Sequence, residues 1–294
     1  MSDSAQSLRD FKPKHDFFIG IDSDGCVFDS MEIKHKECFT PMFVKHHNLQ
    51  AVSKYAREVW DFVNLYSKTR GANRFPALVR ALNLLRERSE VYSRKVNVPS
   101  YPALEDWIKR ESKLGNATLA AEVEGGNEDL SIIKKWSDEV NEQVSDIVHG
   151  VPPFPLLRET LDKSLPQADM MVISQTPCDA LQREWAEHDI SKYVEIIAGQ
   201  EMGTKTEHIK FAAVGKYDSN KILMIGDAPG DHKAAKANGV LFYPILPGHE
   251  ERSWERLHTE ALDRFFSGTY AGEYEEKLFL EFDSCLPENP NWKP

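Results

Sequence analysis

The sequence has few cysteines, no long apolar run and no excess of positive charge. Its four cysteines, Cys26, Cys38, Cys178 and Cys285, form neither a CxxC pair nor a repeated spacing, so neither a zinc site nor a disulfide framework is indicated. No stretch is long enough to span a membrane and the polar residues 1–14 lack an apolar signal core, so we expect a cytoplasmic protein. The formal net charge of −11 argues against a nucleic-acid-binding surface.

A short apolar run at residues 17–21, FFIGI, ends abruptly in Asp22 and Asp24. Such a run is typical of a strand buried on both faces in a parallel sheet, and open α/β sheets bind ligands at the carboxyl ends of their strands. On an extended strand Asp22 and Asp24 point the same way, and Gly25 allows a sharp turn after them. The same residues could equally form a turn with local hydrogen bonds from the aspartates.

Helical periodicity replaces the strand signals between residues 30 and 150, which predicts a separate helical module. The chain of 294 residues is long enough for a domain with a large insertion, or for two domains. Residues 150–155, GVPPFP, end the module because proline cannot continue a helix. The expected helices are 31–47, 52–66, 75–85, 102–114, 116–124 and 130–149.

A polar loop at residues 67–74, SKTRGANR, carries three cations inside this module. It predicts either a solvated turn, a set of cations that cap helix ends, or a loop that faces an anion. In the last case Arg70, Asn73 and Arg74, with Lys68, are the candidate contacts to a substrate.

Strands alternate with helices after residue 150, which predicts right-handed crossovers and a parallel sheet. The fold class is therefore α/β, a Rossmann-like sheet flanked by helices, built from residues 1–29 and 151–247, with 30–150 as an inserted all-helical domain. Residues 248–294 form a C-terminal extension that we expect to pack on the core. In it 256–266 reads as a helix, 274–282 as a helix or an edge strand, and 286–294 as extended chain. The expected strands are 170–174, 194–198, 221–227 and 240–243.

Polar side chains follow three of the predicted strands: Asp22 and Asp24, then Ser174, then Asp227 with Asp231. Four carboxylates gathered at one sheet edge would repel by roughly 4 kcal/mol per close pair, so a cation must offset them. All-oxygen ligands favour a hard ion, and a substrate phosphate in the site favours Mg²⁺.

Two other side chains near these motifs have plainer explanations. His232, beside Asp231, could be a metal ligand, although a histidine on a helix surface is the commoner case. Cys26 could be a nucleophile, although a small buried residue is the more frequent role.

Taken together and in this order, the motifs resemble those of the haloacid dehalogenase superfamily. They are the apolar strand ending in Asp22-x-Asp24-Gly-x-x-x-Asp, the strand ending in Ser174, a lysine before the fourth strand, and Gly226-Asp227-x-x-x-Asp231. The long helical insertion is similar to the C1-type cap of that superfamily. The resemblance covers roughly residues 17–245 and leaves the tail without a counterpart.

The resemblance implies that Asp22 is a nucleophile that forms an aspartyl-phosphate. Asp24 would be the general acid for the leaving alcohol and then the general base for water. Lys205 is the lysine that best matches the third motif, because it opens a helix after the third strand. Ser174 would hydrogen-bond a phosphoryl oxygen, and Gln175 could assist it.

The resemblance also implies Mg²⁺, bound by Asp22, by Asp227 and by the main-chain carbonyl of Asp24. Asp231 would orient the metal's waters or the lysine rather than bind the ion itself. The expected metal site is therefore drawn from Asp22, Asp24, Asp227 and Asp231.

The function expected from these residues is a Mg²⁺-dependent phosphatase for a small phosphorylated metabolite, present as a monomer or homodimer and binding neither nucleic acid nor membranes. A phosphomutase shares every core residue, and a phosphonate hydrolase would need a cap lysine that forms a Schiff base. An alternative of another class is a catalytically silent binding protein that keeps the fold.

Overall fold

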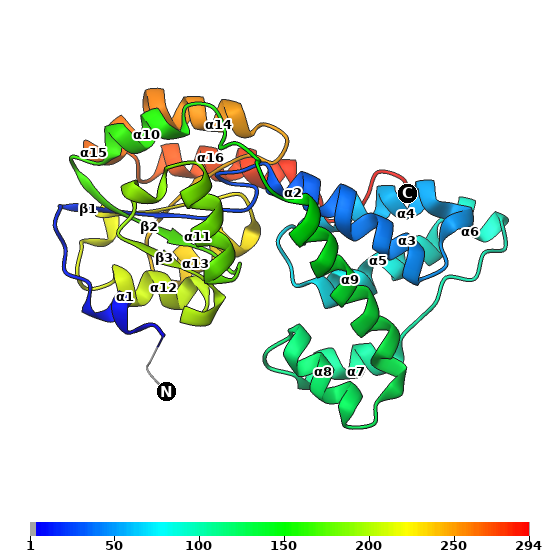
Figure 1. Ribbon diagram of the computed structural model, residues 1–294. Helices are drawn as coiled ribbons and strands as arrows, with labels where there is room; N and C mark the ends of the chain where they lie inside the picture. The colour runs from blue at the N-terminus through cyan, green and yellow to red at the C-terminus, as the bar shows by residue number, and fades with distance from the viewer. Residues whose placement is uncertain (1–3, 294) are drawn as a thin grey trace. The chain divides into compact units, whose positions relative to one another are not determined.

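The computed structural model describes residues 4–293 and divides into two compact units (Figure 1). The first, which we call the α/β unit, contains the chain up to Ser30 and Gly150–Leu286. The second, the helical unit, contains Met31–His149 and the chain from Pro287 on. Among the described residues no helix has both the length and the apolarity that crossing a membrane requires.

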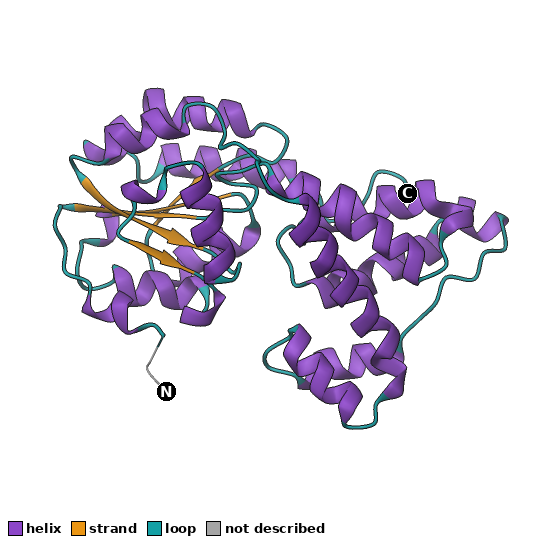
Figure 2. Ribbon diagram, in the orientation of Figure 1, coloured by secondary structure: helices purple, strands orange, loops and turns teal. Residues whose placement is uncertain are grey.

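A five-stranded parallel sheet forms the centre of the α/β unit (Figure 2). Its strand order is β3-β2-β1-β4-β5, so the first strand of the chain lies in the middle. The predicted α/β fold class is confirmed. The strands are β1 (Phe17–Ile21), β2 (Ala168–Ile173), β3 (Ile196–Ala198), β4 (Ile222–Gly226) and β5 (Leu241–Pro244).

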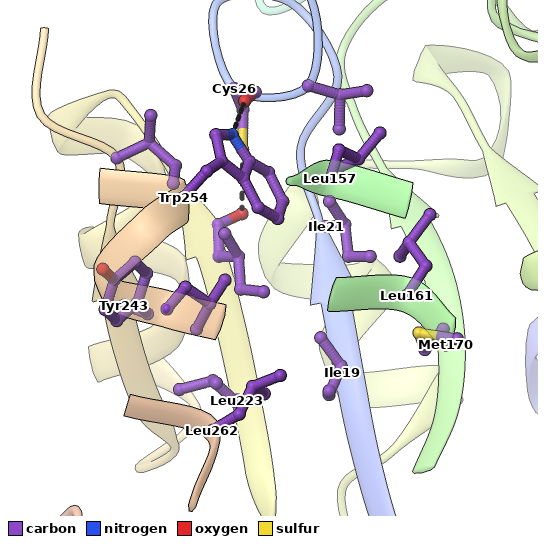
Figure 3. Packing of buried hydrophobic residues seen from close by; sticks show 14 of the residues in the cluster. Ile19, Ile21, Cys26, Leu157, Leu161, Met170, Leu223, Tyr243, Trp254 and Leu262 are labelled. Carbon is purple, nitrogen blue, oxygen red and sulfur yellow. Dashed lines mark hydrogen bonds between the residues drawn. The ribbon is translucent and has the colours of Figure 1, made fainter. Parts of the chain in front are cut away.

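Both faces of this sheet are covered, because successive side chains of β1 enter two different apolar clusters. Ile19 and Ile21 pack with residues of the helices at 157–164, 178–187, 250–256 and 262–266, whereas Phe18 packs with residues of the helices at 6–10, 205–212 and 229–237. Figure 3 shows the first cluster, where Trp254 donates a hydrogen bond from Nε1 to the carbonyl of Cys26 at 2.8 Å. Each fully buried isoleucine, leucine or phenylalanine in these clusters stabilises the fold by about 1.5–3 kcal/mol.

Helices alternate with the strands of the α/β unit after residue 150, as predicted, and the helix at 6–10 is a further one that the sequence did not indicate. They are α1 (Gln6–Asp10), α10 (Leu157–Ser164), α11 (Cys178–Glu187), α12 (Lys205–Ala212), α13 (Pro229–Ala237), α14 (Glu250–Arg256), α15 (Leu262–Phe266) and α16 (Glu273–Cys285). A π-helical segment, Leu257–Ala261, joins α14 to α15, and short 3-10 turns lie at Ser191–Tyr193, Gln200–Met202 and Ser219–Lys221.

The helical unit has an aromatic core. Phe39 and Phe43 lie against Trp60, with ring centroids 5.9 and 4.8 Å from it, and Trp136 meets the same indole edge-on at 5.9 Å. Its elements are α2 (Ser30–Ile33), the π-helical segment Lys34–Phe39, α3 (Thr40–His46), α4 (Ser53–Asn64), α5 (Arg74–Glu87), α6 (Ser89–Ser93), α7 (Pro102–Arg110), α8 (Asn116–Glu124) and α9 (Ser131–Ile147), with 3-10 turns at Gln50–Val52 and Glu128–Leu130.

The end of the chain departs from the prediction that the whole extension packs on the core. Helices α14–α16 contribute to the apolar clusters of the α/β unit, and α16 is a helix, which settles the open alternative at residues 274–282. From Pro287 on, the chain contacts the helical unit instead: Trp292 lies edge-on to Phe62 at 5.6 Å, and the Arg88 guanidinium lies 4.5 Å from the Trp292 ring. An aromatic side chain thus finds apolar and cationic partners there that the local sequence could not indicate.

Candidate active site

Three buried aspartates meet at the carboxyl ends of the neighbouring strands β1 and β4. Asp22 follows β1, Asp227 follows β4, and Asp231 lies in the first turn of α13. One carboxylate oxygen from each lies within 4.8 Å of the others, and the three residues are 4 %, 1 % and 0 % exposed. At this separation each pair of charges repels by roughly 3 kcal/mol at an intermediate dielectric, so the cluster needs positive charge.

Lys205 supplies one such charge. Its Nζ lies 2.6 Å from Asp22 Oδ2 and 2.5 Å from Asp231 Oδ1. Burial by itself would lower the pKa of Lys205, but the attraction of the two carboxylates is stronger and raises it above its ordinary value. The lysine is placed by its position as the first residue of α12, where Thr204 and Glu207 form a capping box.

Asp22 is held through both carboxylate oxygens. Oδ1 accepts a hydrogen bond from the Ser23 amide at 2.8 Å, while Oδ2 faces Lys205. Burial raises the pKa of Asp22 to about 6; Lys205 counteracts this effect, and Asp231 adds to it. The result is a carboxylate oriented by neighbours on either side, which suits a nucleophile.

Asp231 orients the lysine and caps a helix at the same time. Its Oδ1 accepts from Lys205, and its Oδ2 accepts from the amide of Ala228, the N-cap residue of α13, at 3.0 Å. Gly226 makes this placement possible, because a Cβ at that position would lie 2.4 Å from Asp231 Cγ. Both oxygens of Asp231 are therefore used by the protein, as the expected role in orienting the lysine requires.

Asp24 accepts hydrogen bonds from two hydroxyl groups. Oδ1 accepts from Ser30 Oγ at 2.6 Å and Oδ2 accepts from Thr176 Oγ1 at 2.9 Å. Gly25, with φ of 75°, allows the chain to turn directly after it. The contact with Ser30 was not anticipated, because no sequence motif links a serine six residues along to the carboxylate.

Ser174 ends β2 at the same edge of the sheet and is 2 % exposed. Its Oγ accepts from the Thr176 amide at 3.2 Å, which fixes the loop after the strand. Gln175 donates from Nε2 to the carbonyls of Ser174 at 3.2 Å and Gly203 at 3.0 Å. Gln175 thus joins the loop after β2 to the loop that precedes Lys205, which gives it a structural task besides the predicted substrate contact.

Arg70 and Asn73 make contacts inside the helical unit. Arg70 donates from Nη1 to the Leu65 carbonyl at 2.9 Å. Asn73 is the N-cap of α5: its Oδ1 accepts from the Phe75 amide at 3.0 Å, and its Nδ2 donates to the Leu114 carbonyl at 3.0 Å. Leu65 is the C-cap of α4, so Arg70 fits the alternative in which cations of this loop cap helix ends. Asn73 caps the start of α5 instead, and a substrate contact stays a prediction for both residues.

Arg74 connects α5 to α9. Its Nη1 donates to Ser137 Oγ at 3.0 Å and Asn141 Oδ1 at 2.8 Å, and its guanidinium lies 5.0 Å from the Phe39 ring. Burial lowers the pKa of Arg74 to about 10, which leaves it charged at neutral pH. All these partners are neutral.

Cys26 is the small buried residue that the sequence suggested, whereas His232 is partly buried against aromatic rings and does not lie free on a helix surface. Cys26 is fully buried, and burial followed by the charge of Asp227 raises the pKa of its thiol well above the ordinary value, so it is no thiolate nucleophile. His232 stacks on Phe279 with ring centroids 4.1 Å apart and meets Phe242 edge-on at 5.3 Å.

The donor set fits a hard divalent cation. When all three buried aspartates are ionised, Lys205 cancels one of their three charges, and a divalent ion matches the remainder. Carboxylate oxygens without imidazole or thiolate partners are the ligands preferred by Mg²⁺.

Comparison with known proteins gives one family. Residues 100–245 match the model for haloacid dehalogenase-like hydrolases, a range that includes Ser174, Lys205 and Asp227 but begins after Asp22 and Asp24. None of the curated proteins matches the chain.

Similar solved structures carry related descriptions. One described as a haloacid dehalogenase-like hydrolase, from Bacteroides fragilis, is 16% identical, with 81% of this chain and 92% of that chain covered and a TM-score of 0.50. A haloacid dehalogenase-like family protein from Streptococcus pneumoniae is 13% identical, with 83% and 91% covered and a TM-score of 0.48. A predicted phosphoglycolate phosphatase from Haemophilus somnus 129PT is 15% identical, with 79% and 86% covered and a TM-score of 0.47. At these identities the first of them supports the fold.

Proposed function

We propose that this chain, a haloacid dehalogenase-like hydrolase by its match over residues 100–245, is a Mg²⁺-dependent phosphomonoesterase for a small phosphorylated metabolite of the cytoplasm. The observation that carries this proposal is the burial of Asp22 and the set of groups that surround its carboxylate. It is buried at the end of the central strand, fixed on one oxygen by Ser23 and on the other by Lys205, and lies beside Asp227 and Asp231.

In the proposed reaction a carboxylate oxygen of Asp22 attacks phosphorus and forms an aspartyl-phosphate, while the ester bond to the alcohol breaks. Asp24, protonated at this point, gives its proton to the departing alkoxide. Asp24 then takes a proton from water, whose oxygen attacks phosphorus and releases inorganic phosphate and free Asp22. The two residues between which Asp24 lies, Ser30 and Thr176, keep it close to the nucleophile's strand.

Lys205 and Ser174 act on charge and orientation. We assign Lys205 to the neutralisation of charge on Asp22 and the phosphoryl group, and Ser174 Oγ to a hydrogen bond with a phosphoryl oxygen. Asp22, Asp227 and the main-chain carbonyl of Asp24 would hold Mg²⁺, which supplies further neutralisation of the transferring group. Asp231 fixes the lysine.

Substrate binding by the helical unit remains part of the proposal. Arg74 is the first candidate, because its hydrogen bonds to Ser137 and Asn141 join it to neutral groups; the charge of Asp138 acts on it as well. Arg70, Asn73 and Gln175 are proposed as further contributors, and each of them, like Arg74, also bonds to other parts of the fold.

The test is a hydrolysis screen with a panel of phosphorylated metabolites and a generic aryl phosphate, with and without Mg²⁺. We expect release of inorganic phosphate that requires Mg²⁺ and that Asp22→Asn removes. Isomerised sugar phosphate in place of free phosphate would show a mutase, and loss of activity after borohydride treatment with substrate would show a Schiff-base phosphonate hydrolase. Hydrolysis that Asp22→Asn leaves intact would contradict the proposal.

A further inference from the structure

Ser23, the residue between the two site aspartates, is fully buried and hydrogen-bonded to α11. Its Oγ donates to Glu184 Oε2 at 3.1 Å and accepts from Trp185 Nε1 at 3.0 Å. Ser23 lies between Asp22 and Asp24 in the segment that follows β1, and its hydroxyl contacts α11. The hydroxyl of Ser23 is thus used to attach the loop to two consecutive residues of one helix.

The main chain of Ser23 holds the loop itself. Its amide donates to Asp22 Oδ1 at 2.8 Å, and its carbonyl accepts from the amides of Cys26 at 3.2 Å and Val27 at 2.8 Å. One residue therefore connects the nucleophile's carboxylate, the turn that carries Asp24, and α11.

Trp185 holds the same loop at a second point. Its indole is fully buried and meets Phe28 edge-on, with centroids 6.3 Å apart and an interplanar angle of 88°. Phe28 is bridged to Asp24 through the backbone. In addition, α11 starts at Cys178, directly after the loop of Ser174 and Thr176, so the segments that follow β1 and β2 are fixed to a common element.

We propose that Ser23 is a positioning residue, which acts through Trp185 and Glu184 to hold Asp22 and Asp24 in their reactive placement. The inference rests on the proposed function for its kinetic test. A displacement of reacting groups by about 1 Å is enough to cost up to 100-fold in rate, so a side chain that touches no substrate can still govern the chemical step.

The first test is Ser23→Ala, with Ser253→Ala as the matched control. Ser253 is as fully buried as Ser23, accepts from the Leu246 amide at 3.0 Å and donates to the His249 carbonyl at 2.9 Å, so its loss removes a comparable pair of hydrogen bonds elsewhere. We expect Ser23→Ala to lower kcat for an aryl phosphate at least 10-fold with KM within 2-fold, and Ser253→Ala to leave both unchanged. An equal effect of the two variants would overturn the inference.

A double-mutant cycle identifies the route. Trp185→Phe removes the indole donor, and if Ser23 acts through it, the variant with both substitutions loses no more activity than Ser23→Ala alone. Independent, multiplying losses would show that the two residues act separately and would refute the assignment.

Amide exchange gives a readout that needs no activity. Because the Ser23 amide donates to Asp22, Trp185→Phe is expected to speed hydrogen exchange at this amide at least 10-fold, whereas Ser253→Ala leaves it unchanged. Absence of Mg²⁺-dependent hydrolysis in the wild type would defeat the proposed function alone. Unchanged exchange at Ser23 in Trp185→Phe would defeat the positioning role alone.

Discussion

Gly226→Ala is the sharpest steric perturbation that the site offers. A Cβ at this position would lie 2.4 Å from Cγ, 2.5 Å from Cβ and 2.5 Å from Oδ2 of Asp231, a fully buried residue. Ordinary contact begins near 3.4 Å, so the side chain must move by about 1 Å and loses its positions against Lys205 Nζ and the Ala228 amide. We expect a stability loss of about 1–3 kcal/mol from overpacking. The displaced lysine should lower kcat by up to about 100-fold.

The assay compares Gly226→Ala with Gly230→Ala, in which the new methyl group meets no atom within 4 Å. Urea midpoints report stability, and hydrolysis of an aryl phosphate with saturating Mg²⁺ reports kcat. Gly230 lies in α13, where alanine is favoured over glycine, so this control should keep full activity and equal or higher stability. If Gly226→Ala kept wild-type kcat, the close packing of Asp231 against β4 would not be what places Lys205.

Three further predictions concern charge, pH and the C-terminal residues. Lys205→Met leaves the buried carboxylates of Asp22 and Asp231 without their cation and should lower kcat by roughly 100-fold or more. Lys210→Met, at an exposed position of the same helix, should leave kcat unchanged, and steady-state rates of the two variants test this. Burial lowers the pKa of His47 from 6.5 to about 3, so below pH 6.5 the unfolded chain binds a proton that the folded chain does not. The free energy of unfolding therefore decreases as the pH is lowered from 6.5 towards 3, by at most about 1.4 kcal/mol per pH unit. Urea midpoints at pH 7.5 and 5.0 should differ less in His47→Gln than in the wild type, and an equal difference would contradict this. Trp292→Ala should lower the urea midpoint by the equivalent of about 1–2 kcal/mol, because Phe62 and Arg88 lose their partner, whereas Lys293→Ala removes an exposed ion pair and should change it little.

The parallel sheet could be predicted from the sequence because its strands are short apolar runs separated by amphipathic helices. The run at 17–21 became the central strand, and Asp22 and Asp227 lie side by side because β1 and β4 are neighbours. Lys205 was identified from its position at a helix start, and it does reach Asp22. The local sequence pattern was sufficient to predict these positions, because side chains that follow neighbouring parallel strands lie at the same edge of the sheet.

Contacts between distant segments could not be predicted in the same way. Leu8 in the polar N-terminal segment is fully buried on α1, and Trp292 packs against Phe62 across 230 positions of sequence. Neither has a periodic pattern around it. Ser23 and Trp185 likewise belong to no sequence motif, and their hydrogen bond becomes evident only from the packing of α11 against the end of β1.

The central claim, that Asp22 is the nucleophile of a phosphotransfer site, is tested most directly by trapping the phosphorylated protein. Asp24→Asn lacks the base for the second step, and nitrophenyl phosphate as the substrate avoids the need for the acid in the first step, because nitrophenolate departs without a proton. Acid quench within the first turnover followed by peptide mass analysis should therefore find one phosphoryl group on the peptide that contains Asp22. Asp24→Asn combined with Asp22→Asn should carry none. Phosphate on a different residue, or in the double variant as well, would contradict the account.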